Sequence, residues 1–142
     1  MTIRPELIQR LRDKRAKLSE HVSREKLDAL HARGQLSARE RIGELVIAGS
    51  FQEFGLHAAH NATHFGMAGR TLPADGVIAG TGYVGDTQVA VVSQDFSVVA
   101  GTLGKMQAKK ITRTMLHALK IGVPVVAFKD SGGARIQEGV DA

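Results

Sequence analysis

Residues 124–139 read Pro-Val-Val-Ala-Phe-Lys-Asp-Ser-Gly-Gly-Ala-Arg-Ile-Gln-Glu-Gly. The apolar run 124–128 predicts a buried strand, with proline at its first position, where a missing N–H is tolerated. The small residues Gly132, Gly133 and Ala134 predict a tight bend directly after this strand. Because backbone N–H groups often face a ligand where a strand turns toward a helix, this bend is the first candidate site.

The bend has two possible roles. It can be a plain structural turn, or its amides can stabilise an enolate or oxyanion on a bound carbonyl compound. Other phosphate and nucleophile motifs are excluded. The stretch lacks the Walker pattern G-x-x-x-x-G-K-[ST], Ser131 is not in a G-x-S-x-G elbow, and no helix follows Gly80-Thr81-Gly82 as a dinucleotide site requires.

Upstream of this strand, residues 101–121 predict a helix that ends at Gly122. Its expected apolar positions are Leu103, Met106, Ile111, Met115, Leu116 and Leu119. Its polar side carries only basic residues, which are Lys105, Lys109, Lys110, Arg113 and Lys120. This side is either a solvated surface or a binding surface for phosphate or another acidic ligand.

Residues 76–94 predict a β-hairpin, because two runs of β-forming residues flank Gly85-Asp86. Their continuous apolar character predicts that both faces are covered. Residues 57–75 predict a long loop that contains His57, His60 and His64. A metal site at these histidines is disfavoured, since the only nearby carboxylate is Glu53 and a rigid helix is not expected there.

The first 50 residues predict three helices. The third begins with a capping box, in which the Ser37 hydroxyl accepts from the Glu40 amide and the Glu40 carboxylate reaches back. Residues 1–41 contain eleven basic and six acidic residues, an excess equal to the net charge of +5 for the whole chain. This segment is either a solvated face or a surface for phosphorylated ligands. A nucleic-acid surface is disfavoured because only 4% of the residues are aromatic.

The composition limits the class of protein. The chain has 142 residues, of which 43% are hydrophobic and 23% are charged, close to the average for globular domains. Its apolar runs are far shorter than a membrane span, and its first residues are not typical of a signal peptide. Since cysteine is absent, disulfides and cysteine metal sites are excluded. We therefore predict a cytoplasmic location.

The run Asp130-Ser131-Gly132-Gly133-Ala134-Arg135-Ile136-Gln137-Glu138-Gly139-Val140 resembles a signature of the carboxyltransferase subunit of biotin-dependent acyl-CoA carboxylases, especially the propionyl-CoA carboxylase β chains. Further stretches resemble this family in the same order, and together they span nearly the whole chain. They are Gly34–Ile42, Gly49–Glu53, Asp75–Val77, Gln94–Phe96, Gly101–Gly104 and Lys110-Ile111.

The resemblance implies an α/β crotonase-like fold of repeated β-β-α units, preceded by a helical arm. We expect the arm at residues 1–50 and the incomplete start of the carboxyltransferase domain at 51–142. The resemblance also implies carboxyl transfer from carboxybiotin, carried on another protein, to a short acyl-CoA through an enolate. The expected site residues are the backbone amides of Gly132, Gly133 and Ala134, with Lys105, Lys109, Lys110 and Arg135 for CoA.

The family's chains are about four times as long, and the resemblance places the partner amide donor, which comes from a later Gly-Gly, and the biotin side of the site beyond Ala142. The expected partners are a biotin carboxylase or biotin carrier subunit and further copies of the same subunit, without metal, nucleic acid or membrane. Two alternatives stay open. One is a biotin-dependent decarboxylase, and the other is a non-catalytic fragment that only binds CoA or assembles with a partner.

Overall fold

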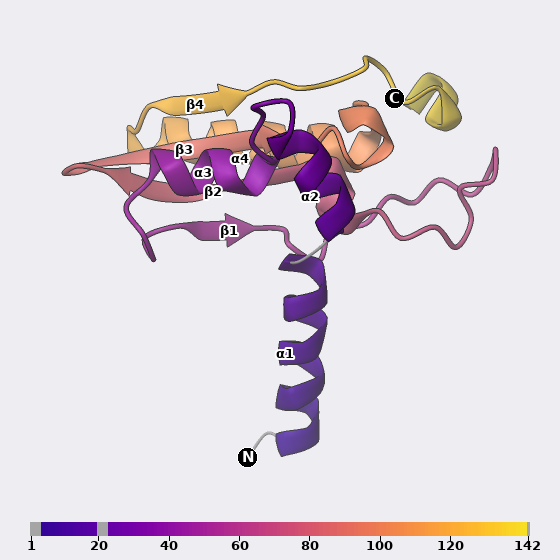
Figure 1. The fold of residues 1–142 in the computed structure, drawn as a ribbon, viewed down its shortest axis with the longest axis horizontal. Coiled ribbons are helices and arrows are strands. Elements are labelled where there is room, and N and C mark those ends of the chain that lie inside the picture. Colours follow the sequence, from indigo (N-terminus) through magenta and orange to yellow (C-terminus); the bar gives the residue numbers. More distant parts are fainter. Residues whose placement is uncertain (1–3, 20–22, 142) are drawn as a thin grey trace.

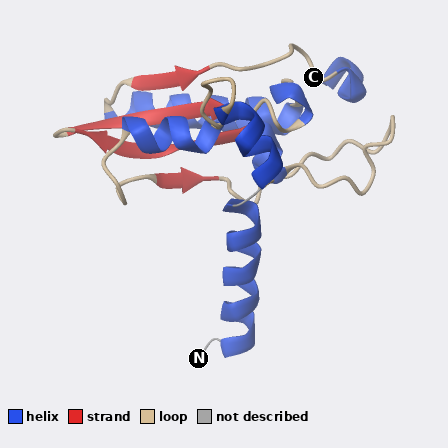
Figure 2. Ribbon diagram, viewed as in Figure 1, coloured by secondary structure: helices blue, strands red, loops and turns tan. Residues whose placement is uncertain are grey.

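The computed structural model describes residues 4–19 and 23–141. Four strands form one mixed sheet in the order β1-β2-β3-β4 (Figure 2). They are β1 (Gln52–Phe54), β2 (Val77–Val84), β3 (Thr87–Gln94) and β4 (Val125–Phe128). β1, β2 and β3 are antiparallel neighbours, whereas β4 lies parallel to β3 and is reached through a helical crossover.

The predicted hairpin is confirmed. Val84 pairs with Thr87, so Gly85 and Asp86 form a two-residue turn between β2 and β3. The six residues from Val77 onward in β2 and the last six of β3 are buried, as their apolar character predicts. The hairpin is therefore the centre of the sheet, and β1 and β4 lie at its edges.

Two helices cover opposite faces of this sheet, α3 (Ala38–Leu45) and α4 (Lys105–Ile121) (Figure 1). Successive strand residues point to opposite faces. Ile78 belongs to the buried cluster that includes Ile42 of α3, whereas its neighbours Val77 and Ala79 pack with Ile111 of α4. The molecule thus has three layers, and the predicted capping box at the start of α3 is present.

The orientation of α4 differs from the prediction. Met115, Leu116 and Leu119 are exposed, and the buried residues of the helix are Gln107, Lys110, Thr114 and Ala118. The polar side chains turn inward because carbonyl groups of neighbouring segments need donors there. The Gln107 amide, for example, donates to the carbonyl of Gly76 at 3.1 Å. The helix also begins at Lys105, later than expected, because residues 99–101 form a separate 3-10 turn.

The remaining helices are α1 (Pro5–Ser19) and α2 (Arg24–His31). No described residue of either helix is buried, and α1 projects away from the sheet in Figure 1. Of the three helices predicted for residues 1–50, only the third therefore contributes to the core. Within the described residues, no helix is both long enough and apolar enough to cross a bilayer.

Three short 3-10 segments complete the surroundings of the bend. They are Pro73–Gly76 before β2, Val99–Gly101 before α4 and Ile136–Asp141 after the bend. The predicted loop over residues 57–75 is present, although its last part forms the first of these segments. The second segment contacts the bend through its Ala100 carbonyl, and the third segment follows the bend directly.

Candidate functional site

The bend at residues 130–135 follows β4 and lies against residues 99–103. The Gly132 N–H donates to the carbonyl of Ala100 at 2.8 Å. The Leu103 N–H donates to the carbonyl of Gly133, and the Arg135 N–H donates to the carbonyl of Leu103, each at 2.8 Å. These last two bonds form a parallel β-bridge between Leu103 and Ala134. The backbone of the bend is therefore fixed by a segment that is some thirty residues away in the sequence.

The three predicted donor amides have different surroundings. The Gly132 N–H is occupied by Ala100, so the expectation that it faces a ligand is wrong. The Gly133 N–H donates to the Ser131 hydroxyl at 3.2 Å, a long contact within an exposed turn. The N–H of Ala134 has no hydrogen-bond partner in the part of the chain that the structure describes, and Ala134 is exposed. Of the three predicted amides, Ala134 thus offers the one without a partner among the described residues.

This open donor lies on a cavity of about 480 Å³. The cavity lies between β3, β4, α4 and the bend, and most of its lining is apolar. It is lined by Val92, Gln94, Leu103, Ile111, Met115, Ala127, Phe128, Lys129, Ser131, Gly133 and Ala134. An N–H at the edge of an apolar cavity can stabilise negative charge on a bound carbonyl oxygen once the bound molecule has displaced the water around it.

Two lining residues were not predicted from the sequence. Lys129 is exposed and directly precedes the bend, so it brings a positive charge to the cavity. Gln94 is buried at the end of β3, and its side-chain oxygen accepts from the Asp130 N–H at 3.3 Å. Gln94 therefore helps to set where β4 turns into the bend. In the sequence, only its charge and its position directly before the candidate bend indicate that Lys129 could belong to the site.

The three predicted lysines are separated by the fold. Lys105 and Lys109 are exposed on the first turns of α4. Lys110 is buried, and its ammonium donates to the carbonyls of Ala74 at 2.9 Å and Val77 at 2.5 Å. Burial lowers the pKa of Lys110 to about 8, an effect that the nearby Glu53 carboxylate opposes. Because its ammonium is held by these two carbonyls inside the protein, Lys110 has a structural role and does not reach a CoA phosphate at the surface.

The titration of Lys110 makes a testable contribution to stability. In the unfolded chain Lys110 keeps its ordinary pKa of 10.5, so between pH 8 and 10.5 the unfolded state binds more protons. The free energy of unfolding therefore rises across this window, by roughly 2–3 kcal/mol at 1.36 kcal/mol per pKa unit. We expect urea unfolding of the wild-type chain to show this rise relative to Lys110→Met, which has no such group. Parallel pH profiles of the two proteins would contradict it.

Arg135 is also placed differently from the prediction. Its side chain has no exposed surface, and its guanidinium lies 2.6 Å from Asp75 and 2.9 Å from Glu138. A guanidinium enclosed in this way cannot reach a phosphate, so the expected CoA contact of Arg135 is wrong. The guanidinium of Arg135 is instead paired with two carboxylates inside the protein.

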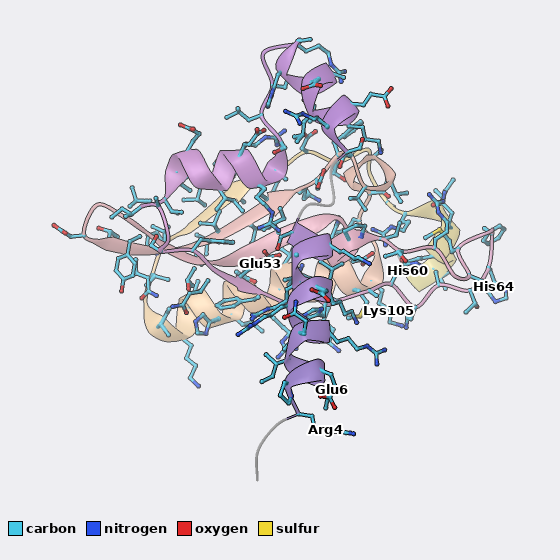
Figure 3. All side chains as sticks on the ribbon, turned by 60° about the horizontal axis from the view of Figure 1, so that its bottom comes forward. Arg4, Glu6, Glu53, His60, His64 and Lys105 are labelled. Carbon is cyan, nitrogen blue, oxygen red and sulfur yellow. The ribbon has the colours of Figure 1, made fainter. Side chains whose placement is uncertain are left out.

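The histidines of the long loop do not form a metal site. Figure 3 labels His60 and His64 on the loop, where His60 contacts the carbonyl of Arg70 at 2.8 Å through its Nε2 atom. Over residues 4–19 and 23–141, no three His, Asp or Glu side chains lie together so that they could hold a metal ion.

Residues 29–142 match the family model of the carboxyl transferase domain. The chain belongs to the carboxyl transferase family. It is 42% identical over 137 residues to the propionyl-CoA carboxylase β chain of Roseobacter denitrificans. It is also 43% identical over 142 residues to the α subunit of the methylmalonyl-CoA decarboxylase of Propionigenium modestum. These two matches cover 96% and 100% of this chain, but only 27% and 28% of the two relatives.

The structure of the carboxyl transferase chain matches that of transcarboxylase 12S with a TM-score of 0.92 and 38% identity. The match covers 99% of this chain and 28% of that protein, which was solved with methylmalonyl-coenzyme A and methylmalonic acid bound. The predicted family and the α/β crotonase-like fold class are thereby confirmed. The chain spans about a quarter of the length of the relatives that it matches.

Proposed function

We propose that this chain forms the acyl-CoA side of a carboxyltransferase active site. The supporting observation is the open N–H of Ala134 at the edge of the apolar cavity beside β4. A thioester oxygen held there becomes more negative as the α-carbon loses its proton, so a hydrogen bond from this N–H strengthens as the enolate forms. The Gly133 N–H, now held by the Ser131 hydroxyl, is the second donor of this proposal.

The proposed substrate is a short acyl-CoA of the propionyl-CoA or acetyl-CoA type. The apolar lining from Ile111 and Met115 suits a small acyl group. Lys105 and Lys109 are proposed to contact the CoA phosphates, since both are exposed near the start of α4. Lys129 adds a further positive charge at the cavity itself.

The carboxyl group is proposed to come from biotin carried on a partner protein. Carboxybiotin supplies it by exchanging N–CO₂⁻ for N–H, while the α-carbon exchanges C–H for C–CO₂⁻. No residue of this chain is assigned to biotin, because the resemblance places that side of the site beyond residue 142. The proposed partners are a biotin carboxylase or biotin carrier subunit, and a cytoplasmic location stays a prediction.

The reverse reaction is the second candidate function. The chain is as similar to a methylmalonyl-CoA decarboxylase subunit as to a propionyl-CoA carboxylase β chain. The same open N–H would stabilise the enolate that forms when a carboxyl group leaves.

Assembly with further copies is also proposed, since the apolar side chains of Leu7, Ile8 and Leu11 on α1 are 38–50% exposed.

The proposal is tested in a chimeric enzyme, in which residues 1–142 replace the matching quarter of the R. denitrificans β chain. We expect the chimera, supplied with its biotin-carrying subunit, to carboxylate propionyl-CoA at a rate within about tenfold of the unmodified β chain, because one side of the site is retained. The isolated 142-residue chain is expected to show no turnover. A folded, assembled chimera that neither carboxylates propionyl-CoA nor decarboxylates methylmalonyl-CoA would overturn the proposal.

A further inference from the structure

The bend rests on a buried ionic cluster that the proposed mechanism does not use. The Arg135 cluster consists of Arg135, Asp75 and Glu138. One guanidinium nitrogen lies 2.6 Å from Oδ1 of Asp75 and 2.9 Å from Oε1 of Glu138. The other terminal nitrogen donates to the carbonyl of Thr102 at 3.0 Å. A single side chain thus joins the bend to three other segments of the fold.

Glu138 connects this cluster to the start of α4. Its second oxygen accepts from the backbone N–H of Lys105 at 2.7 Å, one of the N–H groups that a helix start leaves without an internal partner. The preceding residue, Gly104, is the N-cap and supplies no side-chain cap. A Cβ at Gly104 would lie 2.5 Å from Arg135 and 2.6 Å from Glu138, so only glycine leaves room for the cluster.

Asp75 connects the cluster to the start of β2. It lies in the 3-10 segment before this strand, with a positive φ of 53° that is uncommon for aspartate. Burial raises the pKa of Asp75, although the hydrogen bond from Arg135 opposes this effect. Its Oδ2 atom and the Nε atom of Arg135 lack hydrogen-bond partners among the described residues. Holding these charges inside the protein therefore has a substantial energetic cost.

A buried ion pair is a poor source of stability compared with apolar side chains of the same volume. Its geometry is more informative here, because Ala134 directly precedes Arg135. The Arg135 backbone N–H is bonded to Leu103, and its side chain is bonded to Asp75, Glu138 and Thr102. The peptide that follows Ala134 is thus held through both backbone and side chain.

We propose that the Arg135 cluster is a positioning device that fixes the direction of the Ala134 N–H relative to the cavity. This inference rests on the proposed function, in which that N–H is the donor to the thioester oxygen. Arg135, Asp75 and Glu138 are positioning residues, since all three act through the backbone of the bend. The cluster connects the bend to the start of α4 through Glu138 and to the 3-10 segment before β2 through Asp75.

The first test measures amide hydrogen exchange in the 142-residue chain and needs no turnover. Arg135→Lys keeps the charge but cannot bond Asp75, Glu138 and Thr102 together. We expect exchange at the N–H groups of Leu103 and Arg135 to accelerate at least about tenfold, because the β-bridge loosens. The amide of Val91 in the central hairpin is expected to keep its wild-type rate. Unchanged exchange at Leu103 and residue 135 in a folded variant overturns the inference.

The second test separates positioning from binding in the chimeric enzyme. Misplacing a donor by about 1 Å can lower a rate about 10²-fold, so Arg135→Lys is expected to lower kcat about 10–100-fold with little change in KM for propionyl-CoA. Glu138→Ala is expected to lower kcat about tenfold, whereas Glu138→Gln, which keeps an oxygen acceptor, retains most of it. Arg70→Lys, an exposed change in the loop before β2, is the matched control.

The outcomes of the two tests distinguish the proposals. A wild-type kcat in Arg135→Lys and Glu138→Ala would refute the positioning role and leave the proposed function standing. A rise in KM at constant kcat would refute it as well, since that pattern indicates loss of substrate binding. If the unmodified chimera has no turnover, the proposed function fails, and hydrogen exchange alone decides whether the cluster orders the bend.

Discussion

Replacing Ala134 by proline is expected to lower the kcat of the chimeric enzyme by about 10²–10³, the typical effect of removing one oxyanion donor. Proline has no N–H, and the position makes no other backbone donation that the change would remove. The flanking bonds of the β-bridge involve the carbonyl of Gly133 and the N–H of Arg135, both of which proline leaves in place.

The control for this prediction is Ala134→Gly, which keeps the N–H and removes only a methyl group. We expect its kcat to stay within about threefold of wild type, well inside the loss expected when a donor is removed. Steady-state kinetics with propionyl-CoA measure both variants, and circular dichroism checks that they fold. An unchanged kcat in folded Ala134→Pro would show that this N–H is not a donor.

The second large effect is expected at Gly101, where the 3-10 turn before α4 meets the bend. A Cβ at this position would overlap the carbonyl oxygen of Asp130, and the φ of +63° is itself unfavourable for alanine. Gly101→Ala must therefore separate residues 99–103 from the bend. We expect a loss of roughly 2–4 kcal/mol in stability, from backbone strain and overpacking together.

The same separation misplaces Ala134, so the kcat of the chimeric enzyme is expected to fall by about 10²-fold. Gly122→Ala is the matched control, because Gly122 has a similar φ of +71° but nothing within 4 Å of its added Cβ. It should lose only about 1–2 kcal/mol from strain and keep its kcat. Urea unfolding and kinetics on both variants test the comparison, and equal losses of kcat would contradict it.

The sequence predicts the parts of this fold that depend on local patterns. The hairpin follows from two β-forming runs around Gly85-Asp86, and the start of α3 follows from the Ser37 and Glu40 capping box. The buried face of α4 could not be predicted in this way. Gln107 and Lys110 turn inward because their side chains donate hydrogen bonds to backbone carbonyls. The accepting residues, Gly76, Ala74 and Val77, are 31 to 36 residues away in the sequence.

The candidate site was predictable to a similar extent. Small residues after a strand indicate where amides can be exposed, and the bend is found there. Which amide is open depends on residues 99–103. Their carbonyls accept a hydrogen bond from the Gly132 N–H and none from the Ala134 N–H. Arg135 was expected to contact CoA, but its side chain is bonded to Asp75 inside the protein. Its partner Asp75 is 60 residues away, and no local pattern reveals that pairing.

Ala134 and Arg135 are consecutive, yet one is exposed to solvent and the other is completely buried. This alternation makes the stretch unusually sensitive to changes in length. A one-residue insertion or deletion between Phe128 and Ala134 would shift the bridge to Leu103 by one residue, so the exposed and buried positions beside this bridge would be exchanged. The guanidinium would then face water and the donor would face the interior, so point substitutions are better tolerated here than indels.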